Sequence, residues 1–345
     1  MKPISGNATK LRQINRDIIL AALKARDSAS IAELSRLTGL SVGTCANIVP
    51  ELLANGEVVE LGERTSQGGR PARRFAHNPD NTLVLALVLK SVRNVETLSR
   101  WVTNAADKTV EAGIVAEPRV TPEDFDNAVA DAVARHPSIR AVAISIPGVV
   151  GAGVVETCDI ADFIGIDLEK RVLDTSGLGA FTDNDMNFSA MGYYQKRPER
   201  HPAGLAYIIV PDDTNVGCGM IVNGALVRGR SNFAGELSHI PFAGGGRTPG
   251  RNRTGGDTFV MRICCAVAAV INPDVIVLCG EAAEKTTPRA LRAACLPFIP
   301  ERHLPEIVIK PSYEEDCLAG MTAMALAGIS SDIQLVERGG RRSRR

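Results

Sequence analysis

The chain has 345 residues, of which 45% are hydrophobic and 23% are charged, so it can form two or three folded domains and is not a disordered protein. Its 39 basic and 39 acidic residues cancel, which excludes a net charge that attracts nucleic acid and leaves that attraction to local charge. The sequence has no N-terminal apolar leader, no apolar run of roughly 18 residues and no CxxC spacing among its eight cysteines, so we expect a reduced, cytoplasmic protein that does not enter a membrane.

The N-terminal part of the chain predicts three helices. Apolar residues recur at helical spacing through residues 11–26 and define one stripe. The stripe consists of Leu11, Ile14, Ile18, Ile19 and Ala22. Ser30 is suited to cap a second helix, because Glu33 stands at the capping-box position. Gly39 follows where the chain must turn sharply, and Ser41 is suited to cap a third helix.

A β-hairpin is predicted after the three helices. Residues 58–61 predict a strand, residues 66–69 the tip of a hairpin, and residues 73–76 the returning strand. Three helices followed by a hairpin are typical of a winged helix-turn-helix, so we expect a DNA-binding domain over residues 1–80. A protein-interaction domain of the same helical pattern is the alternative.

The third helix carries the residues expected to read DNA. A recognition helix lies in the major groove and needs short polar side chains that reach base edges and phosphates. Ser41, Thr44 and Asn47 share one face, where Asn47 suits a bidentate contact to adenine and the two hydroxyls suit phosphates. Plain surface polarity is the alternative for this face. Pro50 predicts a kink or an early end of the helix, because proline lacks the N–H group. The opposite, core-facing stripe is expected to be Val42, Cys45, Ile48 and Val49.

Four arginines gather in the wing, within a domain that has eleven basic and eight acidic side chains up to residue 80. We expect them to lie along a minor groove, with Arg70 entering it because glycines and a proline flank it. The four are Arg64, Arg70, Arg73 and Arg74. A solvated hairpin that does not touch DNA is the alternative.

Beyond residue 80, strand-like and helix-like segments alternate, which is typical of α/β layers. The turn-forming residues 78–81 mark a boundary, so we expect a second domain over residues 81–332. Residues 333–345 predict a disordered basic tail, either simply solvated or adding non-specific affinity for phosphates. The predicted strands are 83–89, 141–146, 205–210, 275–279 and 307–309, and the predicted helices are 122–135, one from Phe188 onward, 257–270, 287–295 and one from Cys317 onward.

Several motifs, in this order, resemble the ROK family (repressor, open reading frame, kinase). They are Gly-Gly-Arg-Pro in the wing, Ser145-Ile-Pro-Gly-Val149, Asn184-Asp-Met-Asn187, Ala234-Gly-Glu-Leu-Ser-His239 and residues 272–280. The resemblance covers nearly the full length of the regulator form of the family. It implies an actin-like, ribonuclease-H-like two-lobed sugar-kinase fold, a sugar bound between the lobes, and a homodimer or a dimer of dimers.

The resemblance also implies which residues bind the sugar. Asp185 matches the catalytic base of the family's kinases, which deprotonates a sugar hydroxyl. Glu236 and His239 match residues that hydrogen-bond sugar hydroxyls, although each alone would also suit a surface ion pair. The full implied set is Pro147, Gly148, Asn184, Asp185, Glu236 and His239.

Both phosphate-binding loops of the family's kinases are altered in this chain. Where those kinases have Asp-x-Gly-Gly-Thr, residues 89–94 read Leu-Lys-Ser-Val-Arg-Asn and contain no glycine. Where they have Gly-Thr-Gly-x-Gly, residues 213–217 read Asp-Thr-Asn-Val-Gly after Asp212, so carboxylates stand where phosphates would lie. We therefore expect no ATP binding and no phosphoryl transfer, although Asp185 remains.

The zinc-binding cysteine cluster of the family is also missing. Residues 240–257 contain no cysteine, and His239 alone cannot supply the four ligands of a structural zinc site. We expect no zinc, and a flexible loop rich in glycine and arginine in its place.

These observations predict a DNA-binding transcription regulator, most simply a repressor, that senses a sugar or sugar derivative and is not an enzyme. Its expected partners are a double-stranded operator, the small sugar and a second copy of itself, with no membrane. One alternative is a bifunctional sugar kinase, which would need the altered phosphate loops. Another is an effector-blind DNA-binding scaffold, which the lost zinc cluster favours.

Overall fold

The computed structural model describes residues 5–62, 73–151, 153–197, 201–211, 216–240 and 256–330. The chain divides into two compact units, Met1–Leu83 and Val84–Arg345, and the boundary expected after residue 80 lies three residues before this division. The expected tail, 333–345, lies outside the described residues. Within the described part, no single helix is both long and apolar enough to cross a membrane; the bent pair Ile31–Thr38 and Val42–Ala54 meets those criteria only in combination.

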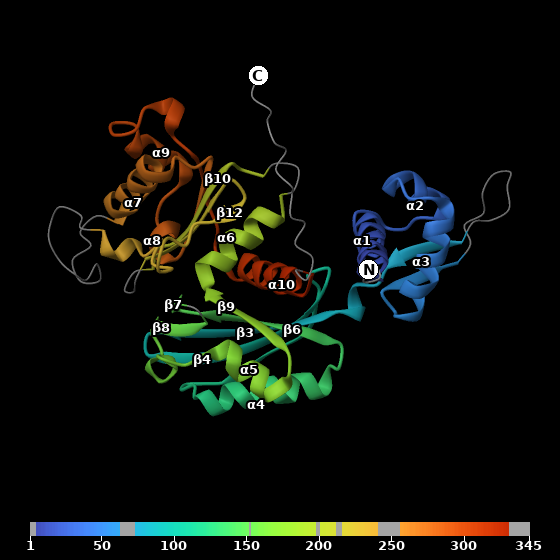
Figure 1. The fold of residues 1–345 in the computed structure, drawn as a ribbon. Coiled ribbons are helices and arrows are strands. Elements are labelled where there is room, and N and C mark those ends of the chain that lie inside the picture. Colours follow the sequence, from blue (N-terminus) through green and yellow to red (C-terminus); the bar gives the residue numbers. More distant parts are fainter. Residues whose placement is uncertain are drawn as a thin grey trace, which may run out of the picture. The chain divides into compact units, whose positions relative to one another are not determined.

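The first unit contains three helices and a two-stranded antiparallel sheet (Figure 1). Ser30 accepts a hydrogen bond from the Glu33 amide while the Glu33 carboxylate accepts one from the Ser30 amide, which confirms the predicted capping box. Gly39 ends the second helix with a φ of 71°, a conformation that favours glycine. The elements are α1 (Ser5–Lys24), α2 (Ile31–Thr38), α3 (Val42–Ala54), β1 (Val58–Leu61), β2 (Arg74–His77) and the short 3-10 helix Pro79–Asn81.

Three sequence expectations for this unit need correction. On α1, Leu11 is 59% exposed and Ile18 38% exposed, whereas Leu23 enters the core, so the buried stripe is rotated from the one predicted. Val42 is 56% exposed because it occupies the first position of α3, at the edge of the core-facing stripe. Pro50 lies inside α3, which continues to Ala54. The proline is on the exposed face, so the carbonyl group that it leaves without an N–H partner can bind water.

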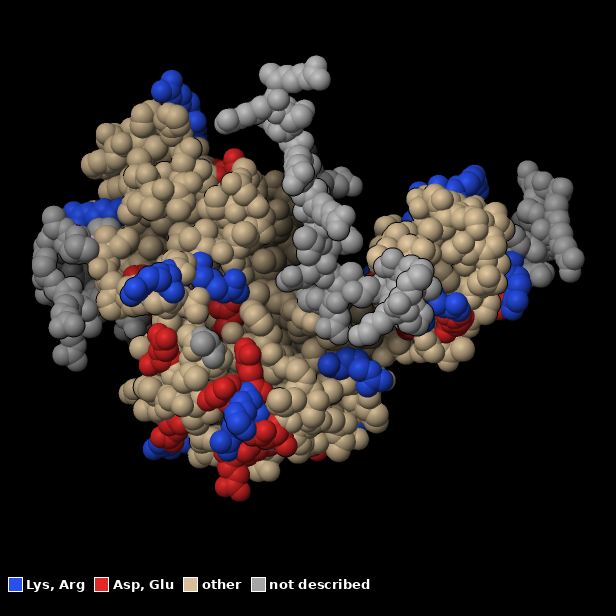
Figure 2. All heavy atoms as spheres, viewed as in Figure 1, with Lys and Arg blue, Asp and Glu red and all other residues tan. Residues whose placement is uncertain are grey.

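The first lobe of the second unit is a five-stranded sheet in the order β5-β4-β3-β6-β9. Helices α4 and α5 cover one face of this sheet (Figure 1), and the Arg171 guanidinium binds the Asp126 carboxylate at 2.6 Å to join them. Figure 2 shows acidic and basic side chains intermixed on this lobe. Its elements are β3 (Leu83–Val92), β4 (Val95–Asn104), β5 (Thr109–Ala116), α4 (Pro122–Arg135), β6 (Ile139–Ile146), β7 (Gly148–Gly151), β8 (Val154–Cys158), the 3-10 helix Ala161–Phe163, α5 (Leu168–Ser176) and β9 (Gly179–Asn184).

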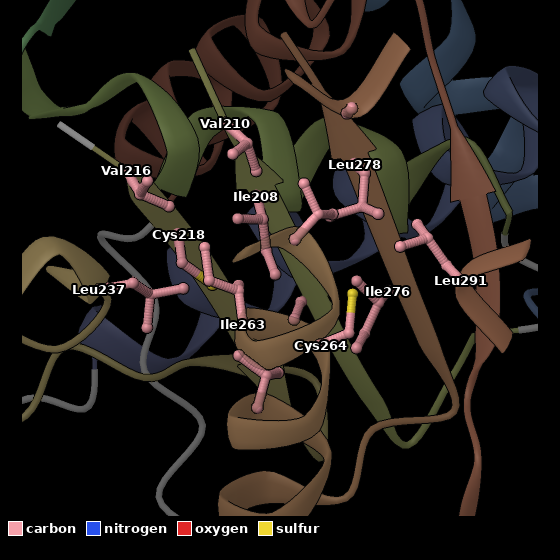
Figure 3. Packing of buried hydrophobic residues seen from close by; sticks show 14 of the residues in the cluster. Ile208, Val210, Val216, Cys218, Leu237, Ile263, Cys264, Ile276, Leu278 and Leu291 are labelled. Atoms are coloured by element: carbon pink, nitrogen blue, oxygen red, sulfur yellow. The ribbon is translucent and has the colours of Figure 1, made fainter. Parts of the chain in front are cut away.

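The second lobe is another five-stranded sheet, in the order β12-β11-β10-β13-β14. Apolar side chains on one face, including Ile208 and Ile276, pack against Ile263 and Cys264 of α7 (Figure 3). The central strands β10 and β13 are almost entirely buried, which explains why each appears in the sequence as a continuous apolar run. The elements are β10 (Gly204–Ile209), β11 (Gly217–Val222), β12 (Ala225–Leu226), α7 (Gly256–Ile271), β13 (Val275–Cys279), α8 (Glu281–Glu284), α9 (Pro288–Cys295), the 3-10 helix Glu301–His303 and β14 (Glu306–Ile309).

Two helices, α6 (Asp185–Gln195) and α10 (Glu314–Ser330), lie between the two sheets (Figure 1). Phe188 of α6 packs in the core of the first lobe, whereas Met186 packs in the core of the second. The helices cross closely, because a Cβ atom at Gly192 would lie 1.8 Å from the carbonyl oxygen of Asp316. The predicted start of α6 at Phe188 is wrong by three residues, since Asn184 caps the helix.

Candidate functional site

Two of the predicted sugar-binding motifs meet where strands β6 and β9 end. The strands are parallel neighbours, and Ile146 pairs with Asn184, so Pro147 and Asp185 leave the same edge of the sheet. The Asn184 side-chain amide donates to the Gly148 carbonyl oxygen at 3.0 Å, while its oxygen accepts from the Met186 amide at 2.8 Å. Asn184 therefore joins the two motifs and caps α6 at the same time.

Asp185 is a half-buried carboxylate at the start of α6. Burial raises its pKa to about 6; the Met186 amide and the Lys90 ammonium lower the pKa, and the Glu236 and Asp159 carboxylates raise it. These charges act on Asp185 from three different segments of the chain. The structure therefore brings Glu236 of the third predicted motif into the surroundings of Asp185.

Glu236 is held at the start of the short 3-10 helix Leu237–His239. Gly235, with a φ of 103°, precedes it, and a Cβ atom there would lie 1.9 Å from the Cys218 carbonyl oxygen, so this turn needs glycine. Burial raises the pKa of Glu236, His239 lowers it and Asp159 raises it. His239 itself is exposed, and its ring lies 5.0 Å from the ring of Phe233.

Asp159 joins the site although the sequence analysis did not single it out. Its backbone amide donates to the Pro147 carbonyl oxygen at 3.0 Å, because the β7-β8 hairpin returns the chain to the starting motif. Partial desolvation by the surrounding protein raises the pKa of Asp159 even though its side chain keeps open surface. The glycine-containing segment 151–153 between valine-rich stretches was the available signal for this hairpin.

Lys90 is the positive charge acting on Asp185 in this arrangement. Its ammonium lies 2.5 Å from a carboxylate oxygen of Glu314 and 5.2 Å from the centre of the Tyr313 ring. Residues 89–92 belong to β3, and Arg93 and Asn94 turn the chain into β4 with φ values of 51° and 64°. The segment at the position of the first phosphate loop is thus a β-hairpin.

Two further contacts join the lobes beside the site, and no sequence signal pointed to them. The Arg228 guanidinium binds the buried Asp183 carboxylate at 2.5 Å. The Asn232 side-chain amide donates to the Val150 carbonyl oxygen at 2.6 Å. Both donors precede the motif that contains Glu236, so they fix that motif against the ends of β7 and β9.

The expectations on cofactors depend mainly on segments that the structure does not describe. Residues 212–215 and 241–255 lie outside the described ranges. Within the part of the chain that is described, no group of three histidine, cysteine, aspartate or glutamate residues is arranged to hold a metal ion. The absence of ATP and zinc therefore stays a prediction.

In the first unit, the predicted DNA-reading residues lie on the exposed side of α3. Ser41 caps the helix by accepting from the Thr44 amide at 3.0 Å, and the two hydroxyl oxygens lie 2.8 Å apart. Asn47 is exposed one turn further along. The three residues are thus placed on one surface, where the Ser41 hydroxyl caps the helix and the Thr44 hydroxyl forms a hydrogen bond with it.

The wing arginines separate into two groups. Arg74 donates to the Ser28 hydroxyl at 3.0 Å, to the Ser28 carbonyl oxygen at 2.8 Å and to the Glu33 carboxylate at 2.9 Å, so its side chain anchors β2 to α2. Arg73 is exposed and pairs with Glu60 of β1. Arg64 and Arg70 lie outside the described residues.

Each of the two units contains a segment that matches a known protein family. Residues 97–266 match the model of the ROK family, and residues 13–57 match a model of winged helix-turn-helix DNA-binding domains.

A putative xylose repressor of Caldicellulosiruptor sp. (strain Rt8B.4) is 26% identical over 247 residues, which cover 68% of this chain and 60% of the relative. The xylose repressor of Bacillus subtilis (strain 168) is 23% identical, over 67% of this chain and 61% of the relative. The matches thus span about 60% of the length of these relatives. An N-acetyl-D-glucosamine kinase of Yersinia enterocolitica is 34% identical over 102 residues, or 29% of this chain and 33% of the relative.

Solved structures show the same fold. A ROK family transcriptional regulator, described as a homolog of the E. coli MLC protein, aligns with a TM-score of 0.66 and 17% identity over 92% of this chain and 96% of its own. The ROK hexokinase from Thermus thermophilus aligns with a TM-score of 0.58 and 18% identity over 72% of this chain and 99% of its own. The chain therefore carries a ROK family domain over residues 97–266 and a winged helix-turn-helix domain before it.

Proposed function

We propose that the protein is a DNA-binding transcription repressor whose second unit senses a sugar or sugar derivative. The observation that carries this proposal is the convergence of Asn184, Asp185 and Glu236 in a chain that also has a winged helix-turn-helix unit. The xylose repressors among its relatives support the same function.

The chemistry of the site suits a polyol. Carboxylates accept hydrogen bonds from hydroxyl groups, and the raised pKa of Asp185 places its protonation near neutral pH. The Lys90 ammonium, which pairs with Glu314, acts on Asp185 as a positive charge. Convergent polar groups distinguish sugars that differ at one hydroxyl, because an unmatched polar group is left without a partner.

A sugar bound here would contact both lobes, since Asp185 starts α6 and Glu236 belongs to the second lobe. A ligand that binds one arrangement of the lobes more tightly than another shifts the population toward it. We propose that this shift changes the affinity of the first unit for its operator.

The protein is further proposed to lack kinase activity and to use neither ATP nor zinc. The β-hairpin at residues 89–94 and the carboxylates of Asp212 and Asp213 support this proposal. One observation favours the kinase alternative: Asp185, with a pKa of about 6, would suit a general base. A coupled assay of ADP release across hexoses and N-acetylhexosamines separates the two functions.

Homodimerisation, or a dimer of dimers, is part of the proposal because operator half-sites are commonly read in pairs. The second lobe has exposed apolar side chains near the ends of α7 and α9, which we propose as candidates for the interface. They are Val270 at 81%, Leu296 at 44% and Phe298 at 65%. A Phe298→Asp variant that becomes monomeric in sedimentation would support this interface.

The test of the proposed function is thermal unfolding of the full chain against D-xylose, D-glucose, N-acetyl-D-glucosamine, their phosphates and ATP. A ligand at a hundredfold over its dissociation constant stabilises the folded state by about 2.7 kcal/mol. We expect one sugar to shift the transition, ATP to leave it unchanged, and Asp185→Ala to abolish the sugar's shift. No shift with any sugar would leave the effector-blind scaffold, and no preference for upstream DNA over random duplex at moderate salt would exclude a repressor.

A further inference from the structure

The exposed surface of α3 contains several apolar residues, which contacts to phosphates alone would not need. Cys45 and Val49 face the core, whereas Val42, Ala46 and Pro50 are exposed along one side of α3, next to the face that carries Asn47. Successive turns of the helix place Val42 next to Ala46, and Ala46 next to Pro50. Asn47 lies one turn from both Gly43 and Pro50, so the proline ring and an open stretch of helix backbone border its amide.

The same face has no uncompensated negative charge. The first turn of α3 contains no acidic residue, and the Glu51 carboxylate is paired with the Arg12 guanidinium. The hydroxyl groups of Ser41 and Thr44 are engaged with each other at the helix start. The surface thus offers apolar groups and one amide to its partner without repelling a polyanion.

Gly43 leaves the exposed face of α3 without a projecting side chain at its position. A Cβ atom there would find only the Ser41 hydroxyl, at 3.8 Å, so the packing of the domain does not require glycine. An exposed glycine weakens a helix, because the flexible backbone loses more freedom on folding. A glycine that the fold does not need, at the centre of the exposed face, allows another surface to approach the helix backbone closely.

We infer that Val42 and Ala46 contact the 5-methyl groups of thymines, beside an adenine held by Asn47. This inference rests on the proposed DNA-binding function and specifies what the helix reads. The thymine methyl is the apolar group that the major groove presents, and asparagine matches the adenine edge in a bidentate manner. The half-site of this protein therefore contains adjacent A·T pairs, and part of its specificity comes from apolar contact.

The experiment starts with the full-length chain and a pool of duplexes with 20 randomised base pairs. Bound duplexes are selected and sequenced, and each thymine of the enriched site is then replaced by deoxyuridine, which lacks only the methyl group. Burial of one methyl group corresponds to about a fourfold change in the dissociation constant. We expect a loss of about fourfold at one or two thymines next to an adenine.

Protein variants assign the effect to the helix. With Val42→Ser, or Val42→Ala if the serine variant does not fold, replacement of the same thymine should no longer change the affinity. Val110→Ser is the matched control, because Val110 is a similarly exposed valine in the second unit. This control should keep the wild-type sensitivity to deoxyuridine.

The outcomes separate this inference from the proposed function. An enriched site that binds equally well with thymine and deoxyuridine overturns the inference and leaves the repressor function intact; the apolar face would then serve a protein partner. A pool that shows no enrichment overturns sequence-specific DNA binding and the inference with it. Sensitivity to deoxyuridine that persists in the folded Val42 variant would assign the methyl contact to another residue and overturn the role of Val42.

Discussion

The Asn184 side-chain amide donates to the Gly148 carbonyl oxygen at 3.0 Å, and this bond connects two motifs that are 36 residues apart in the sequence. Glycine is required at the acceptor, because a Cβ atom at Gly148 would lie 2.0 Å from the Thr157 carbonyl oxygen of the adjoining hairpin. The same hairpin delivers Asp159 to the site. The Asn184–Gly148 hydrogen bond and the close approach of Gly148 to Thr157 thus fix the backbone of the site beside Asp185.

Replacing Asp185 by asparagine should stabilise the unliganded protein at neutral pH. Burial raises the pKa of Asp185 from its ordinary value of 3.8 to about 6, so the folded state binds the proton more tightly than the unfolded chain. The cost of ionisation therefore grows as the pH rises from about 4 to above 6, and reaches at most about 3 kcal/mol. Urea unfolding at pH 4 and pH 7.5 should show that Asp185→Asn gains stability relative to the wild type only at pH 7.5. An equal effect at both values would contradict the buried charge.

Local rules predicted much of the first unit and some elements of the second, whereas β4, β5, α5, β9 and β11 have no counterpart among the predicted segments. The Ser30 capping box, the Gly39 turn and the start of α4 at Pro122 each depend on residues a few positions apart, so the sequence alone was sufficient. Val42 was misplaced because an apolar side chain at the first position of a helix can lie at the edge of the core-facing stripe.

The long-range contacts of the site were beyond sequence reasoning. Asp159 reaches the site through the pairing of a hairpin, and Arg228 meets Asp183 only because two lobes pack around α6. Neither relationship has a period or a spacing that a single sequence reveals. The sugar-binding motifs could be identified because the resemblance to the ROK family supplied matching residues, which periodicity does not.

Replacing Gly320 by alanine should destabilise the crossing of α6 and α10. The added Cβ atom would lie 1.9 Å from the Phe188 carbonyl oxygen, and the backbone of a packed helix cannot move away cheaply. We expect a loss of about 3 kcal/mol in the free energy of unfolding. Gly328→Ala is the matched control on the same helix, where a Cβ atom meets nothing within 4 Å, and it should be neutral or stabilise by up to about 1 kcal/mol. Similar losses in both variants would mean that the helices do not cross at Gly320.

Arg74→Ala and Arg73→Ala should differ in their effect on stability, although the sequence predicts that both arginines contact DNA. The Arg74 side chain donates three hydrogen bonds to Ser28 and Glu33, so its loss should cost the first unit about 1–2 kcal/mol. Arg73 forms an exposed pair with Glu60, so its loss should cost less than about 0.5 kcal/mol. If Arg73 contacts a phosphate, the slope of log affinity against log salt should fall by about 1. An unchanged slope would remove Arg73 from the DNA interface.

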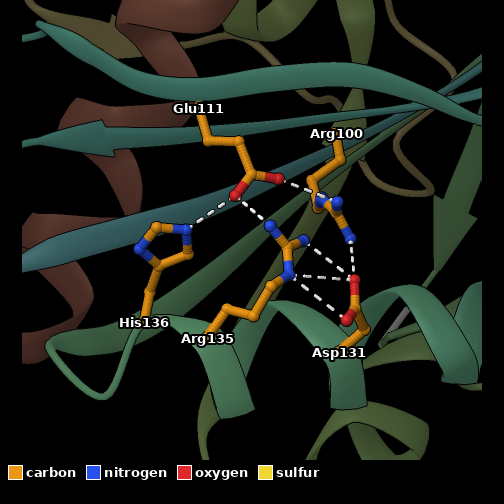
Figure 4. Close-up of polar contacts among 5 residues, drawn as sticks. All are labelled: Arg100, Glu111, Asp131, Arg135 and His136. Atoms are coloured by element: carbon orange, nitrogen blue, oxygen red, sulfur yellow. Dashed lines mark hydrogen bonds and ion pairs between the residues drawn. The ribbon is translucent and has the colours of Figure 1, made fainter.

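A network of charged side chains joins β4, β5 and α4 on the first lobe (Figure 4). Glu111 accepts from the Arg100 guanidinium at 2.8 Å and lies 2.7 Å from the His136 ring nitrogen, and it also pairs with Arg135. Asp131 extends the network by binding Arg100 at 2.8 Å. The Glu111 carboxylate thus links the strands to α4 and its C-terminal end, and the Arg100–Asp131 pair provides a second link.

Glu111→Gln should lower stability at neutral pH and leave it nearly unchanged in acid. Hydrogen bonds from Arg135 and His136 lower the pKa of Glu111 from its ordinary 4.5 to about 2, so the folded state favours the ionised form. The stabilisation is therefore complete above about pH 4.5 and disappears as the pH falls toward 2. Because the side chain is 23% exposed, solvent screening reduces the effect to about 1–2 kcal/mol. Urea unfolding of both proteins should show a difference at pH 7 that shrinks steadily below pH 4.5, while the exposed control Glu117→Gln follows the wild type throughout. A difference that stays constant down to pH 3 would show that Glu111 acts through packing and not through its charge.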